Sequence, residues 1–144
     1  MTFEELDRRF PNGFDDAEIT SLTLDYQTRT AKLELNLRGN PPESPNRDEY
    51  QPALLLLDGF YYFVIEPPDA GHLWYPQRSI QANGYPEDVR QFPLFEALMP
   101  KLSADAFCCR LYVHDWNSFI HVAAKDAQFS WVEGGARAKP ASGS

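Results

Sequence analysis

The chain has few cysteines, few basic residues and no long apolar run. Its only cysteines among 144 residues, Cys108 and Cys109, are adjacent. Neighbouring residues of a strand point to opposite faces, so these thiols are poorly placed to bridge each other, and a disulfide framework is excluded. We expect one buried and one partly exposed thiol. Cysteine usage of this kind is typical of a reducing compartment, and we expect a cytoplasmic protein.

Membranes and nucleic acids are not expected as partners. No segment approaches the roughly 20 consecutive apolar residues of a membrane-spanning helix, and no apolar leader precedes the first acidic residues. The chain has 13 Lys and Arg against 21 Asp and Glu, which gives a net charge of −8, and its basic residues form no cluster. Nucleic acids and anionic membranes are bound through stripes of Lys and Arg, so both are excluded.

Motifs that carry chemistry are also missing. The sequence has no GxSxG, P-loop, GxGxxG, HExxH or EF-hand pattern, so we predict no catalytic residue, no cofactor and no metal site. The three histidines, His72, His114 and His121, lack the local spacing of a zinc site. A small hydrolase or ligand-binding domain that uses these histidines beside an aromatic loop remains the alternative to a binding protein.

The strongest signal that is present is an alternation of apolar and polar residues from Phe14 to Arg38. It breaks once, at the polar turn 27–30. A period of two predicts antiparallel strands that are buried on one face, here about Ala17–Tyr26 and Ala31–Arg38. The apolar positions are Ile19, Leu22, Leu24 and Tyr26 before the turn, and Ala31, Leu33, Leu35 and Leu37 after it.

Further strands follow along the chain. The run Ala53–Ile65 is the most hydrophobic one, and Asp58-Gly59 interrupts it. Two interpretations of that pair stay open: a hairpin turn, or a glycine bulge in one long strand. The segment from Glu66 to Glu87 is rich in proline and glycine, and we expect it to be irregular. Three short runs after it predict a three-stranded meander: Ala106–Asp115, Phe119–Ala124 and Gln128–Val132.

Two helices complete the expected fold. Thr2 and Glu5 form a capping-box pattern, and Pro93–Met99 has the composition of one or two helical turns. We therefore predict an α+β fold: a mainly antiparallel, curled β-sheet of about six or seven strands with one or two short helices. Residues 1–133 are expected to form a single domain, and the Gly/Ala/Ser-rich residues 134–144 a disordered tail.

An uneven distribution of acidic and aromatic residues points to a protein partner. Residues 1–26 contain seven acidic and two basic side chains. Such a region can dock a basic partner, and exposed Trp and Tyr often dominate the binding energy of interfaces. We predict a non-enzymatic protein-binding domain whose partner is a basic protein, with a homodimer as a further possibility. The candidate partner-binding residues are Asp15, Asp16, Glu18, Trp74, Tyr75 and Trp116.

Two segments also resemble known proteins. The opening FDDAEITSLTLDYQTRTAKLELNLR and the later WNSFIHVAAKDAQFSW are similar to the first and last strands of small bacterial α+β proteins with an F/H-D-A-E-I opening. Several of these families are uncharacterised, and some are immunity proteins encoded beside polymorphic toxins. Asp15 stands where members often have His. The resemblance implies a toxin-neutralising protein and transfers no catalytic residue.

Overall fold

The computed structural model describes residues 1–71, 79–86, 93–104 and 106–132. An eight-stranded antiparallel sheet dominates the described part, with strand order β4-β7-β6-β5-β1-β2-β3-β8. The strands are β1 (Ala17–Asp25), β2 (Thr30–Arg38), β3 (Tyr50–Asp58), β4 (Tyr62–Ile65), β5 (Ile80–Pro86), β6 (Phe107–Val113), β7 (Ser118–Ala124) and β8 (Asp126–Trp131). The helical elements are α1 (Phe3–Asp7), α2 (Pro93–Leu98) and a 3₁₀ turn, η2 (Met99–Lys101).

The predicted class is confirmed, because the structure is mostly antiparallel sheet with two short α-helices. The sheet is not closed: its two end strands are β4 and β8. The predicted number of six or seven strands is wrong, because β5 lies within the segment that was expected to be irregular. The predicted tail, residues 134–144, lies outside the described residues. No described helix is long and apolar enough to cross a membrane.

Strand β5 has small inward-facing residues for a packing reason. On the face that carries Ile80, the next two inward-facing residues are Ala82 and Gly84. A Cβ at Gly84 would lie 2.7 Å from the Phe3 ring and 3.0 Å from Phe14 Cβ. The missing side chain therefore makes room for the stacked rings of Phe3 and Phe14, whose centroids are 4.8 Å apart.

The sheet bends where β3 continues into β4. Asp58 pairs with Asp126 and Tyr62 with Ala123, so three residues of one strand lie opposite two of the other. One extra residue in one strand is a β-bulge, and Gly59 supplies it with φ of +65°. Of the two open interpretations the hairpin is excluded, because β3 and β4 do not pair with each other.

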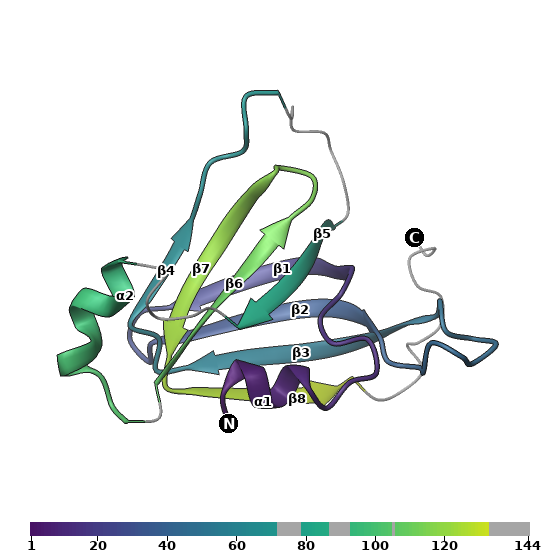
Figure 1. Cartoon of the computed structure of the whole chain (residues 1–144), viewed down its shortest axis with the longest axis horizontal. Helices are drawn as coiled ribbons and strands as arrows, with labels where there is room; N and C mark the ends of the chain where they lie inside the picture. Colours follow the sequence, from purple (N-terminus) through teal and green to yellow (C-terminus); the bar gives the residue numbers. More distant parts are fainter. Residues whose placement is uncertain (72–78, 87–92, 105, 133–144) are drawn as a thin grey trace.

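The predicted three-stranded meander is wrong at its third strand. β6 and β7 form a hairpin, but β8 pairs with β3 rather than with β7. Only Lys125 separates β7 from β8, and one residue cannot reverse the chain direction. In Figure 1, β4, β7, β6 and β5 accordingly form one group of strands, and β1, β2, β3 and β8 run at an angle below it.

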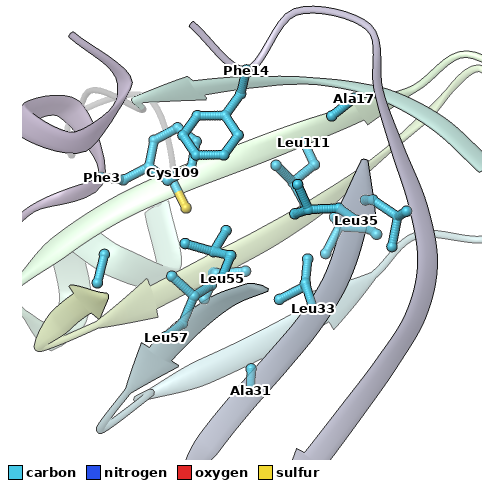
Figure 2. Close-up of a cluster of buried hydrophobic side chains, with 14 of the residues drawn as sticks. Phe3, Phe14, Ala17, Ala31, Leu33, Leu35, Leu55, Leu57, Cys109 and Leu111 are labelled. Carbon is cyan, nitrogen blue, oxygen red and sulfur yellow. The ribbon is translucent and has the colours of Figure 1, made fainter. Parts of the chain in front are cut away.

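The main core fills the space between these two groups of strands. Figure 2 shows leucines of β2 and β3 facing Cys109 and Leu111 of β6, with Phe3 and Phe14 beside them. Cys108 points the opposite way, into a smaller cluster with Tyr62 and Ala123. Both thiols are buried, so the expectation of one partly exposed cysteine is wrong.

Candidate functional site

An apolar pocket of about 240 Å³ lies where the two groups of strands separate. β1 pairs with β5 only from Ala17 to Ile19, and the pocket begins at that point. Residues of β1, β2, β4, β5, β7 and the β6–β7 turn form its apolar wall: Ile19, Leu22, Leu33, Ile65, Ile80, Ile120 and Trp116. Thr20, Ser21 and Ser79 add a small polar part. Pockets that are mainly apolar with a few polar groups are typical of binding sites.

A bulge in β1 sets the direction of the pocket-lining side chains. In a regular strand Ile19 and Leu22 would point to opposite faces. The pairing with β2 shifts between Ile19 and Ser21, so Ile19 pairs with Leu35 and Leu22 with Leu33. Thr20 is the extra residue, and its hydroxyl donates to the Glu34 carbonyl oxygen at 3.0 Å. Both apolar side chains therefore reach the pocket from the same strand.

Trp116 is held in the pocket wall by the turn between β6 and β7. Its amide donates to the Val113 carbonyl oxygen at 3.2 Å, and its own carbonyl oxygen accepts from the Asp69 amide at 2.8 Å. Asn117, with φ of +48°, donates from its side chain to the Asp69 carboxylate at 3.0 Å. These bonds fasten the turn to the segment after β4. Of the predicted aromatic binding residues, Trp116 therefore lines a pocket, whereas Trp74 and Tyr75 lie outside the described residues.

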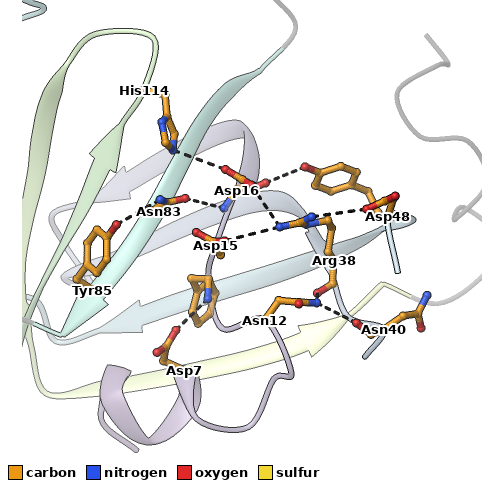
Figure 3. Close-up of polar contacts among 12 residues, drawn as sticks. Asp7, Asn12, Asp15, Asp16, Arg38, Asn40, Asp48, Asn83, Tyr85 and His114 are labelled. Carbon is orange, nitrogen blue, oxygen red and sulfur yellow. Dashed lines mark hydrogen bonds and ion pairs between the residues drawn. The ribbon is translucent and has the colours of Figure 1, made fainter. Parts of the chain in front are cut away.

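A separate polar cluster gathers around Asp15 and Asp16 at the start of β1. Figure 3 shows both carboxylates directed at Arg38, whose guanidinium is 3.2 Å from Asp16, 3.7 Å from Asp15 and 3.8 Å from Asp48. The acidic residues that the sequence predicted as a docking face are therefore partly neutralised by a cation of the same chain.

Two hydrogen bonds fix the backbone of Asp16. Its amide donates to Asn83 Oδ1 at 2.7 Å, and its carbonyl oxygen accepts from the Tyr50 hydroxyl at 3.0 Å. The φ of +53° is unusual for a residue other than glycine, and these bonds hold it there. Burial raises the pKa of Tyr50, and the carboxylate of Glu18 raises it further. Asp16 thus joins β1 to β3 and β5.

The described histidines do not converge on one site. His114 Nε2 is 3.7 Å from the Asp16 carboxylate, whereas His121 Nε2 is 2.8 Å from the carboxylate of Glu66. The rings of Tyr112 and Phe119 lie between them, each in contact with one histidine and with each other. His72 lies outside the described residues. In the described part of the chain, no group of three or more His, Cys, Asp or Glu side chains could hold a metal ion.

Glu66 connects the chain after β4 to β7 through hydrogen bonds with Phe119 and His121. The effect of these bonds on the pKa of Glu66 can be tested. The hydrogen bond with His121, followed by one from the Phe119 amide, holds the pKa of Glu66 below its ordinary value of 4.5. A lowered pKa in the folded state stabilises the fold above the unfolded pKa, and this contribution is lost as the pH falls through the folded pKa.

We therefore expect the stability difference between wild type and Glu66→Gln to be constant at neutral pH. It should shrink as the pH falls below 4.5, the ordinary pKa of Glu66. Urea unfolding of both proteins across this range measures the difference. A stability difference that stays constant down to strongly acidic pH would contradict a lowered pKa of Glu66 in the folded protein.

The consecutive aromatic residues 60–63 belong mainly to the interior. Phe60 and Tyr62 are buried, while Tyr61 and Phe63 are half-buried. Phe60 contacts the rings of Tyr26 and Phe63 and the guanidinium of Arg29. This run therefore stabilises the bend between β3 and β4, and it offers little aromatic surface to a partner.

Comparison with protein-family models, with curated proteins and with solved structures found no match to this chain. The functional interpretation of the pocket therefore depends on the geometry of this structure alone. Sequence reasoning identified Trp116 but missed the rest of the pocket, because six segments, from β1, β2, β4, β5, β7 and the β6–β7 turn, contribute to it. The one local signal was the change of phase between Ile19 and Leu22, which marks the bulge.

Proposed function

We propose that this chain is a protein-binding domain that receives an apolar side chain of its partner in the pocket beside β1. The observation that carries the proposal is the pocket itself, an apolar cavity that is lined by Trp116 and Ile65 and open at the protein surface. Ile65 is 48% exposed although it is large and apolar. Apolar pockets with a tryptophan in the wall are typical of the centres of protein interfaces.

The charges around the pocket favour a basic partner. The carboxylate of Glu34 lies beside the pocket, because it accepts a hydrogen bond at 2.7 Å from the hydroxyl of the lining residue Ser21. The whole chain carries a net charge of −8. An acidic surface accelerates the encounter with a basic protein, while the apolar contact governs how long the complex lasts.

A narrower form of the proposal follows from the resemblance to immunity proteins. In that form the basic partner is a toxin, and this chain neutralises it in the cytoplasm of the producing cell. Binding without chemistry is sufficient for such a role, and it agrees with the separation of His114 from His121. A toxin gene beside the gene for this chain would support this form.

Photo-cross-linking from two neighbouring positions of β4 tests the proposed function. Ile65 lines the pocket, and Val64, which is 36% exposed, lies on the opposite face of the same strand. A photoreactive phenylalanine at position 65 should form an adduct with one protein in the native cell, and the same group at position 64 should not. Ile65→Gln should prevent co-purification of that protein, while Val64→Gln should leave it unchanged.

Equal adducts from both positions would contradict a partner in the pocket. An adduct between two copies of this chain would show a homodimer instead of a separate partner.

A further inference from the structure

In the part of the chain that the structure describes, one half of β1 has an open edge next to the pocket. β1 pairs with β2 along most of its length, but it pairs with β5 only from Ala17 to Ile19. Among the described residues, Ser21–Asp25 therefore has a strand on one side alone. An edge of this kind presents amide and carbonyl groups of alternate residues, and a further strand can pair with it.

The open edge and the pocket are continuous. Ser21 and Leu22 belong both to the open part of β1 and to the wall of the pocket. A chain that lies along this edge would carry side chains with a period of two, alternately toward the pocket and away from it. One apolar side chain can then enter the pocket while its neighbours face solvent.

We propose that the partner binds as an added strand: an extended segment pairs with Ser21–Asp25 of β1 and places one apolar side chain against Trp116. The inference rests on the proposed function and names the form in which the partner is recognised. Backbone hydrogen bonds supply the pairing, and the pocket selects the side chain, as in other cases of strand addition.

Carboxylates near the open edge of β1 indicate that the added strand carries basic residues. Asp25 ends the open edge, and Glu34 of β2 accepts a hydrogen bond from the Ser21 hydroxyl at 2.7 Å. Lys or Arg on either side of the apolar residue would complement these carboxylates. A second copy of this chain is disfavoured as the occupant, because each copy carries a net charge of −8.

A library of random peptides of roughly ten residues, long enough for an ordinary strand, provides the probe. Selection on the full chain should enrich peptides with an aromatic or branched apolar residue flanked by Lys or Arg. The best peptide is then synthesised with a single N-methyl group at each position in turn, and its affinity is measured by calorimetry.

Methylation should weaken binding about tenfold at every second position and have little effect between them, because only alternate amides face β1. Ile65→Gln should weaken binding of the same peptide, and Val64→Gln should not. Sensitivity to Ile65→Gln without the period of two would refute the added strand and leave the pocket as a binding site. Insensitivity to Ile65→Gln, or no enrichment at all, would refute both.

Discussion

Replacement of Leu55 by alanine is expected to destabilise the fold by about 2–5 kcal/mol, the usual cost of removing a buried leucine side chain. Leu55 is 1% exposed, and its neighbours in the sheet are Leu33 of β2 and Phe129 of β8. The surrounding strands are hydrogen-bonded on both sides of β3, so they cannot collapse into the cavity that the substitution leaves. Since small domains have a total stability of about 5–15 kcal/mol, this loss is a large fraction of it.

Leu56→Ala is the matched control, because Leu56 is the next residue of the same strand and is half-buried on the opposite face. Its cost should be clearly smaller. Urea unfolding of the two variants, with unchanged slopes, gives the comparison. Equal losses of stability would mean that both faces of β3 are covered alike, and would contradict the structure at the centre of the sheet.

Replacement of Trp116 by alanine is expected to have the largest effect on binding. An aromatic side chain in the wall of an interface pocket typically contributes about 2 kcal/mol or more, which corresponds to about a 30-fold weaker complex. The change should appear mainly as faster dissociation, because the charges that steer the encounter are unaltered. Surface plasmon resonance with the cross-linked partner separates the two rate constants.

Trp131→Ala serves as the control for a general effect of losing tryptophan. Trp131 packs against Phe10 and Phe129 and does not line the pocket. It should leave the dissociation rate unchanged, and Trp116→Phe should restore most of the lifetime. If both alanine variants accelerate dissociation equally, the effect comes from the stability of the fold and not from the pocket.

Parts of this fold could be predicted from the sequence because their signals are local. The alternation in β1 and β2 and the capping box of α1 both describe contacts between residues close in the chain. The structure confirms both strands and the capping box: β2 shows regular alternate burial, β1 changes phase at the bulge at Thr20, and Thr2 and Glu5 exchange hydrogen bonds. Long apolar runs likewise identified β3, which has a strand on each side.

The features that the sequence did not predict depend on contacts between residues that are far apart in the chain. In β5, Gly84 leaves space for Phe3 and Phe14, which are distant in the chain, and the proline- and glycine-rich sequence around β5 does not indicate this contact. β8 leaves the meander because a single residue, Lys125, links it to β7. The ion pairs of Arg38 with Asp15 and Asp16 join residues more than 20 positions apart, so the sequence presented these acids as a docking face.

Hydrogen exchange of the β1 amides, with and without the selected peptide, tests most directly the claim that β1 and the pocket form one binding surface. In the chain alone, alternate amides of Ser21–Asp25 should exchange rapidly, because no described strand covers that edge. Saturation with the peptide should slow those amides more than about tenfold and leave the amides of β3 unchanged. Amides that are already protected in the chain alone, or that exchange at the same rate in the complex, would contradict the account.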